Sequence, residues 1–221
     1  NPGKFYLYGD KSMNQRDMSR IFIPLEKLGA FFYPKNKNTL PITIQGTSMP
    51  LAQNHIEKLG SAQVKSSLLA AFLNTPGRST IEEKKTSRTH TEILLKKILA
   101  DIKVKKLKKG NLISIKGQKN LSAFNYKVSS DPSSAAFLIA LTILTPGSKL
   151  IIHNCLCNHH RTGFIRILKE KMNANIKIRN IKNVSGERCG TIIVKGSTLK
   201  SLNCPGKLVP SLIDELPILF I

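Results

Sequence analysis

The chain has 221 residues, 41% of them hydrophobic, which is enough apolar content for a buried core in one large domain or in parts of two. It contains no run of about 18 uncharged apolar residues and nothing that resembles a signal sequence, so we expect a soluble cytoplasmic protein with no membrane span. The formal net charge of +22 arises from 27 Lys and 8 Arg against 13 acidic residues. The basic residues are spread over most of the chain and aromatic residues are few, which favours a solvated or compositional charge over a nucleic-acid interface.

The opening segment contains an incomplete set of alternating elements. We expect a strand over residues 4–8, a helix over 16–27 and strands over 30–33 and 41–46. The stretch Gly9-Asp-Lys-Ser-Met-Asn-Gln-Arg16 connects the first strand to the helix, so Arg16 is placed at the predicted helix start. Helix starts attract anions, and an arginine there is suited to bind a phosphate or a carboxylate.

The next segment contains a complete unit in the order strand, helix, strand, helix, strand, strand. Leu68, Leu69 and Phe72 recur at helical spacing, whereas Ile102 and Val104 do not and indicate a strand. A second helix is expected over 89–99, and the closing strands over 99–104 and 112–117. Alternation of this kind implies right-handed parallel crossovers packed on sheets, and therefore an α/β fold.

Two helix starts in this unit carry polar groups suited to an anion. The first reads Gly60-Ser61-Ala62-Gln63, in which glycine allows close backbone approach, Ser61 is a good N-cap and Gln63 adds a neutral donor and acceptor. The second follows Thr86-Ser-Arg-Thr-His-Thr91, where Arg88 is close in sequence to His90. An ordinary capped helix and a surface arginine are the open alternatives at these two positions.

A second copy of the unit begins at Asp131. The stretch from Asp131 to Ile151 aligns with that from Ser61 to Ile81, including a Thr-Pro-Gly turn after each helix. The second helix of this copy is expected over 161–171, and its later strands over 173–178 and 191–196. The copy starts Asp131-Pro132-Ser133-Ser134, a self-satisfied cap whose carboxylate repels anions, so only the earlier copy is suited to bind one.

Thiols and imidazoles gather in the segment His153-Asn-Cys-Leu-Cys-Asn-His-His160. A Cys-x-Cys spacing on a strand places both thiols on one face, which is compatible with a zinc site. The same segment occupies the strand-to-helix turn of the repeat, and no Cys-x2-Cys pair elsewhere completes a site. We therefore expect no metal, and no disulfide framework from Cys155, Cys157, Cys189 and Cys204.

The chain closes on the start of a further copy. Val209-Pro-Ser-Leu-Ile-Asp-Glu-Leu-Pro217 repeats the Pro-Ser helix start and places Asp214 one turn into a helix that begins at Pro210. Asp214 and Glu215 then point about 100° apart, and the repeat favours Asp214 as the one that faces a ligand. Because both terminal copies are incomplete, we interpret the chain as a fragment.

Taken together, these segments resemble the 5-enolpyruvylshikimate-3-phosphate synthase family. The resemblance runs in family order over nearly the whole chain, through Gly9-Asp-x-Ser-Met-x-x-Arg16, Ser61-Ala-Gln-Val-Lys-Ser66, Leu73-Asn-Thr-Pro-Gly77, Ser87-Arg-Thr-His-Thr-Glu92, Asp131-Pro-Ser-Ser134, Arg161-Thr-Gly-Phe164 and Ser211-Leu-Ile-Asp-Glu215. In detail it is similar to the bacterial class with a Ser-Ala-Gln motif. The resemblance implies two domains of three units each, of the inside-out α/β barrel type, with the active site between them. On this basis residues 1–128 are expected to be part of the first domain and residues 129–221 part of the second.

The resemblance also implies a reaction, in which phosphoenolpyruvate gives its enolpyruvyl group to the 5-hydroxyl of shikimate 3-phosphate and phosphate leaves through a tetrahedral intermediate. This step belongs to the shikimate pathway to chorismate and the aromatic amino acids, and uses no cofactor. Residues implied to bind shikimate 3-phosphate are Ser61, Ala62, Gln63 and Arg88; Arg16 and Gln63 face phosphoenolpyruvate, and Asp214 holds shikimate hydroxyls and takes part in proton transfer. We expect a monomer at full length and an inactive fragment. A non-catalytic paralogue and a basic nucleic-acid-binding α/β module are the open alternatives.

Overall fold

The computed structural model describes residues 2–118, 120–204 and 206–220, and the chain divides into two compact units, residues 1–123 and 124–221. The sequence places the boundary slightly later, between residues 128 and 129. Helices alternate with strands in each unit, which confirms the predicted α/β class. No helix among the described residues is long and apolar enough to cross a membrane.

The opening part of unit 1 is a three-stranded antiparallel sheet packed against one helix. The strands β1 (Gly3–Leu7), β2 (Phe31–Tyr33) and β3 (Ile42–Gly46) pair in the order β1-β3-β2. Phe22 of α2 (Ser19–Lys27) stacks on Phe32 with 4.3 Å between ring centroids, and these two rings form a small core with Ile42.

Arg16 does not lie at a helix start, because the helix predicted over 16–27 begins only at Ser19. A short helix α1 (Lys11–Asn14) precedes α2, and Arg16 lies in the turn between them. Asp10 caps α1, since the N–H of Met13 donates to Asp10 Oδ1 at 2.7 Å. The N-cap of α2 is Met18, which makes no side-chain cap bond, and the N–H of Ser19 donates to Asp17 Oδ1 at 2.8 Å. The Asp17 side chain therefore bonds the first residue of α2, and Arg16 is left in the turn before that helix.

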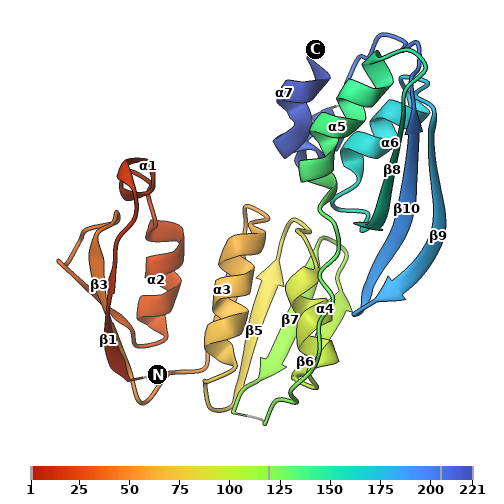
Figure 1. Cartoon of the computed structure of the whole chain (residues 1–221). Helices are drawn as coiled ribbons and strands as arrows, with labels where there is room; N and C mark the ends of the chain where they lie inside the picture. The colour runs from red at the N-terminus through yellow and green to blue at the C-terminus, as the bar shows by residue number, and fades with distance from the viewer. Residues whose placement is uncertain (1, 119, 205, 221) are drawn as a thin grey trace. The chain divides into compact units, whose positions relative to one another are not determined.

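The rest of unit 1 is the complete repeat unit (Figure 1). It runs through β4 (Asn54–Glu57), α3 (Ala62–Phe72), β5 (Arg78–Glu83), α4 (His90–Lys97), β6 (Asp101–Lys106) and β7 (Asn111–Lys116), in the predicted order. The strands form one sheet in the order β4-β5-β7-β6, in which β4 and β5 are parallel and the other pairs are antiparallel. Leu68, Leu69 and Ile81 are fully buried between α3 and the sheet. Because β4 and β5 are parallel, α3 and α4 both begin at the carboxyl edge of this strand pair.

Unit 2 repeats this arrangement, except that the first strand of the unit is replaced by a single bridge. Its elements are α5 (Pro132–Leu144), β8 (Lys149–Leu156), α6 (Gly163–Glu170), β9 (Ile176–Val184) and β10 (Glu187–Lys195). The strands pair antiparallel in the order β8-β10-β9, and Figure 1 shows α5 and α6 on the same side of this sheet. Ile139, Phe164 and Ile192 are buried in the shared core. The place of β4 is taken by a single parallel bridge between Ser130 and Cys155.

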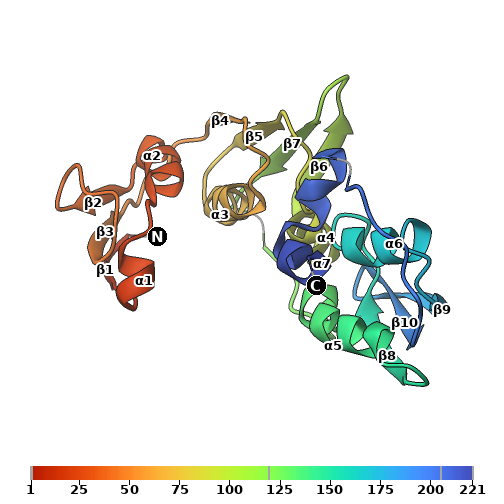
Figure 2. The same ribbon diagram turned by 90° about the horizontal axis from the view of Figure 1, so that it is seen from above.

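The end of the chain differs from the single helix predicted from Pro210. Two 3₁₀ segments, η1 (Gly206–Ser211) and η2 (Ile213–Glu215), precede a short helix α7 (Leu216–Leu219), which lies beside α5 in Figures 1 and 2. The N–H of Leu212 donates to Val209 O at 3.1 Å, and the N–H of Glu215 donates to Leu212 O at 3.0 Å. These bonds span three residues rather than four, so the backbone is wound more tightly than an α-helix. Asp214 lies on this turn with its side chain exposed, whereas Glu215 is buried.

The internal repeat extends to backbone detail. The orders β1-β3-β2, β5-β7-β6 and β8-β10-β9 are equivalent, since in each sheet the last strand of the copy lies in the middle of the three. The turns after α4 and α6 also match, because Leu99 and Asn173 both have a φ of 60°. In each turn the next N–H donates back into the helix, from Ala100 to Leu95 O at 3.0 Å and from Ala174 to Leu168 O at 2.9 Å.

Candidate functional site

The start of α3 is held in place by a carboxylate from the preceding strand. Glu57 is buried at the end of β4, and its Oε1 accepts from the N–H groups of Leu59 at 2.8 Å and Gly60 at 3.0 Å. Gly60 has a φ of +77°, and a Cβ there would lie 3.3 Å from the carbonyl oxygen of Lys85, so the backbone requires glycine. Ser61 is the N-cap of α3, as predicted, and its Oγ accepts from the N–H of Val64 at 3.4 Å.

Arg88 lies on the segment that joins β5 to α4, and a buried ionic network connects this segment to α3. Glu83, the last residue of β5, accepts from the N–H of Ser87 at 2.8 Å. The same carboxylate lies 3.1 Å from Lys65 Nζ, which in turn lies 2.7 Å from Glu92 Oε1 in α4. Lys65 belongs to the first turns of α3, so one buried ammonium joins the helix start of Ser61 and Gln63 to both sides of the Arg88 segment.

The surroundings of Glu83 favour its ionised form. Burial disfavours the charge, but hydrogen bonds from Ser87 and Asn111 and the charge of Lys65 outweigh it, so the pKa of Glu83 lies below its usual range. A further bond crosses between the two helices, since Ser66 Oγ lies 2.6 Å from Thr91 Oγ1. The edge of the sheet that carries Arg88 is therefore tied together by charged and neutral contacts.

A third connection at this edge joins α2 to α3. Arg20 Nη2 donates to Gln63 Oε1 at 3.1 Å, which brings the beginning of α2 to the beginning of α3. Arg16 belongs to the connection between β1 and α2, and its side chain is exposed. A guanidinium can only donate hydrogen bonds, so the atom of the Gln63 amide that faces Arg20 is its oxygen.

The equivalent helix starts in unit 2 hold a cluster of charged side chains. Asp131 caps α5 by accepting from the N–H groups of Ser133 at 3.3 Å and Ser134 at 3.2 Å. Its Oδ1 also pairs with Arg161 Nη2, while Arg161 Nη1 lies 3.4 Å from Asp214 Oδ2. A carboxylate therefore occupies the start of α5, where α3 has a neutral serine.

Arg161 also shapes the ionisation of this cluster. Burial opposes the charge on Asp131, but the hydrogen bond and the charge of Arg161, with hydrogen bonds from Ser134 and Ser133, hold its pKa below the usual range. Asp131 is therefore a permanent anion at neutral pH. Since Asp131 and Arg161 neutralise each other, the start of α5 presents no net positive charge to a ligand.

The cysteine and histidine segment was predicted as a strand-to-helix turn, but residues 153–156 belong to β8 and only residues 157–160 lie between that strand and α6. Burial, with the neighbouring Cys157 and Asp131, raises the pKa of Cys155 to about 12, and burial with the neighbouring Cys189 raises that of Cys157. Both thiols therefore keep their protons at neutral pH and lack the reactivity of a thiolate. Within residues 2–118, 120–204 and 206–220, no group of three or more His, Cys, Asp or Glu side chains is placed to hold a metal ion.

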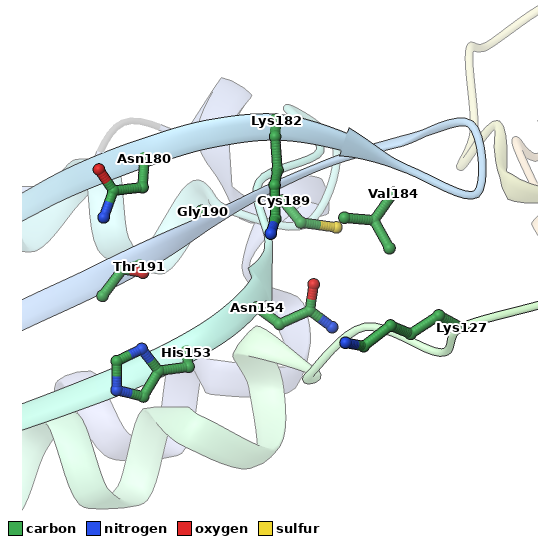
Figure 3. A pocket seen from close by; sticks show the side chains of 9 residues that line it. All are labelled: Lys127, His153, Asn154, Asn180, Lys182, Val184, Cys189, Gly190 and Thr191. Atoms are coloured by element: carbon green, nitrogen blue, oxygen red, sulfur yellow. The ribbon is translucent and has the colours of Figure 1, made fainter.

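A cavity of about 280 Å³ lies on the sheet of unit 2 rather than at the helix starts. Figure 3 shows the side chains that line it, which include Lys127, His153, Asn154 and Lys182. The two ammonium groups suggest an anion, but Asn154 Oδ1 is a buried acceptor without a hydrogen-bond partner in the described part of the chain. A buried acceptor repels an anion, so the lining has no single chemistry that selects a ligand.

The structure brings together most of the residues predicted in unit 1. Ser61, Ala62 and Gln63 start α3, and the Lys65 network joins them to the segment of Arg88. The residues that sequence reasoning missed are Arg20, Arg161 and the buried network itself. The repeat could have identified Arg161, because Arg88-Thr and Arg161-Thr both stand directly before the second helix of their copies.

Chemically, the unit 1 edge offers a hydroxyl, an amide and guanidinium groups at the start of a helix, a set suited to a small anion that also carries hydroxyls. In unit 2, Asp214 offers an exposed carboxylate beside a guanidinium. A carboxylate of this kind can accept a hydrogen bond or a proton from a hydroxyl group.

The chain has close relatives of known name. Residues 1–221 match the family model described as EPSP synthase (3-phosphoshikimate 1-carboxyvinyltransferase). Proteins named 3-phosphoshikimate 1-carboxyvinyltransferase from Zymomonas mobilis and Caldicellulosiruptor saccharolyticus are 40% and 41% identical, over 96% of this chain and 47% and 49% of the relative. A solved EPSP synthase from Acinetobacter baumannii is similar with a TM-score of 0.84 and 36% identity, over 100% of this chain and 49% of that one. The chain thus spans about half the length of the curated relatives it matches.

Proposed function

Because the chain belongs to the EPSP synthase (3-phosphoshikimate 1-carboxyvinyltransferase) family, we propose that it is part of an enolpyruvyl transferase. In a form that spans the length of the relatives, hereafter the full-length form, the protein transfers the enolpyruvyl group of phosphoenolpyruvate to the 5-hydroxyl of shikimate 3-phosphate and releases phosphate. The observation that carries this proposal is the buried contact of Lys65 with Glu83 and Glu92, which holds the start of α3 next to the Arg88 segment.

Shikimate 3-phosphate is assigned to the helix start of α3 and to Arg88. The guanidinium of Arg88 binds the phosphate through charge-assisted hydrogen bonds, and the Ser61 hydroxyl and the backbone at Ala62 add neutral contacts at the positive end of the helix. Gln63 contacts the shikimate ring, and it also faces phosphoenolpyruvate together with Arg16. The bond from Arg20 to Gln63 Oε1 supports this second role, because it places a further cation beside the same amide.

Asp214 is assigned to the reacting hydroxyl. Its carboxylate holds shikimate hydroxyls and accepts the proton of the 5-hydroxyl as the oxygen attacks phosphoenolpyruvate. Support comes from its exposed side chain, while the adjacent Glu215 is buried. The full-length form is further proposed to act as a cytoplasmic monomer without a nucleic-acid partner. The lysines of this chain support the last point, because they lie on many elements rather than on one.

The test is to express the full-length form and to measure phosphate release and product formation with both substrates present. Turnover that requires shikimate 3-phosphate and phosphoenolpyruvate together supports the proposal. The 221-residue chain alone is expected to lack turnover, because it spans about half the length of the relatives. A folded full-length form without turnover contradicts the proposal, and salt-dependent binding to duplex DNA in its place would favour the basic-module alternative.

A further inference from the structure

Arg161 occupies the position in unit 2 that Arg88 occupies in unit 1. Each arginine stands directly before the N-cap threonine of the second helix in its copy, and the two caps have nearly the same backbone angles, φ −106° and ψ 11° at Thr89 against φ −107° and ψ 20° at Thr162. The guanidinium of Arg161 is directed at two carboxylates of its own unit, Asp131 and Asp214. Its side chain is only 12% exposed, so Arg161 contacts carboxylates of the protein rather than a substrate phosphate.

The segment that carries Asp214 has little regular structure of its own. Asp214 lies on the three-residue turn η2, and its side chain is 49% exposed. The preceding segment is pressed against the start of α6, since a Cβ on Gly163 would lie 2.4 Å from the carbonyl oxygen of Ser211. Backbone contact therefore fixes where the segment runs. The orientation of the Asp214 carboxylate needs a separate contact, which Arg161 Nη1 provides at 3.4 Å from Oδ2.

We infer that Arg161 is a positioning residue for Asp214. The inference rests on the proposed function, because it concerns the carboxylate assigned to the 5-hydroxyl of shikimate 3-phosphate. Asp131 pairs with one nitrogen of the Arg161 guanidinium and also accepts hydrogen bonds from the N–H groups of Ser133 and Ser134. The guanidinium is therefore fixed at the start of α5. The other nitrogen then sets the direction of the Asp214 carboxylate. A planar guanidinium can contact two carboxylates in fixed directions, which a lysine ammonium cannot.

A double-mutant cycle in the full-length form tests this inference. Arg161→Ala is expected to lower kcat by about 10²-fold, the size of loss that follows a displacement of about 1 Å at a reacting group, with little change in KM for phosphoenolpyruvate. In the Asp214→Asn background the same substitution is expected to lower kcat by less than about threefold, because residues that act through one another are not additive. Arg161→Lys keeps a positive charge next to Asp131, so it tests the inference even if the alanine variant does not fold. Its kcat is expected to fall at least about tenfold.

Arg166→Ala is the matched control, since Arg166 lies in α6, the helix that follows Arg161, and contacts His159 at 2.9 Å instead of Asp214. Its kcat is expected to stay within about twofold of the unsubstituted enzyme. Equal losses from Arg161→Ala in both backgrounds, or an Arg161→Lys variant with unchanged kcat, would overturn the positioning role while leaving the proposed function intact. An unsubstituted full-length form that lacks turnover would overturn the proposed function, and the positioning role with it.

Discussion

Lys65 Nζ lies 3.1 Å from Glu83 Oε1, and neither side chain has any exposed surface. The pair joins the first turns of α3 to the last residue of β5, immediately before the segment that carries Arg88. A buried ion pair of this kind contributes little net stability in comparison with apolar packing, but removal of one partner leaves an uncompensated buried charge. The contact therefore links the stability of unit 1 to the geometry of the edge that is proposed to bind an anion.

Lys65→Met is expected to lower the free energy of unfolding by about 3–5 kcal/mol, because Glu83 and Glu92 then lose the cation between them. Urea denaturation followed by circular dichroism measures the change. Lys96→Met on the exposed side of α4 is the matched control and is expected to stay within about 0.5 kcal/mol. A loss below about 1 kcal/mol for Lys65→Met would mean that the network relaxes without its ammonium.

Glu83 should also make the stability of the chain depend on acid. Its pKa is lowered in the folded state by Ser87, Asn111 and Lys65 against the effect of burial, so its contribution is complete above the unfolded value near pH 4.5 and is lost as the pH falls through the lower folded value. In Glu83→Gln the drop in stability between pH 6 and pH 3 should be smaller, as measured by urea midpoints on the pH scale. An unchanged acid slope would show that other carboxylates dominate it.

Leu99→Asn should stabilise the chain by about 0.5–1 kcal/mol. Leu99 has a φ of 60°, a left-handed conformation that asparagine tolerates better than leucine, and its side chain is 69% exposed, so little packing is lost. Asn173 already occupies the equivalent turn of unit 2. The reverse substitution, Asn173→Leu, should destabilise by a similar amount, and thermal denaturation of both variants provides the comparison. Shifts of the same sign in the two variants would contradict this explanation.

Arg88→Ala in the full-length form should weaken binding of shikimate 3-phosphate by about 1.5–3 kcal/mol, and Ser61→Ala by less, because a charge-assisted contact exceeds a neutral one. Phosphoenolpyruvate binding should change less in both variants. Titration calorimetry with each ligand measures the difference. Arg78→Ala is the control, since Arg78 is an exposed arginine that pairs with Asp101 at 3.5 Å. Equal losses for the two ligands would remove Arg88 and Ser61 from the shikimate pocket.

Asp214→Asn should lower turnover of the full-length form by about 10² or more, since an amide cannot accept the proton of the attacking hydroxyl. Glu215→Gln should leave turnover within a few fold and act mainly on stability, because the Glu215 side chain is 4% exposed. Steady-state rates at saturating substrates compare the two. A larger loss in Glu215→Gln than in Asp214→Asn would exchange their roles.

The features that could be predicted from the sequence are those that depend on residues close together in the chain. Apolar spacing and the N-cap at Ser61 were sufficient for the order of elements in the complete repeat unit, and the Pro-Ser cap was sufficient for the start of α5. The first predicted helix starts at Ser19 instead of Arg16, where the N–H of Ser19 bonds Asp17, and apolar spacing does not register such a polar contact. The tight winding around Asp214 and the contact of Arg161 with Asp214, 53 residues apart, depend on tertiary packing that no local pattern encodes.

The reduction of a strand to the single bridge at Ser130 has a consequence for self-association. Within the described part of unit 2, β8 is the outer strand of its sheet, and most of its length lacks the parallel neighbour that β4 gives to β5 in unit 1. An outer strand with unpaired N–H and C=O groups can add a strand from another molecule. Lys149 places a charge at the start of β8, and Asn154, with a φ of 51°, interrupts its extended backbone near the end. Both features discourage such pairing, so replacement of Lys149 by an apolar β-branched residue would expose the segment around Ile151 to intermolecular sheet formation.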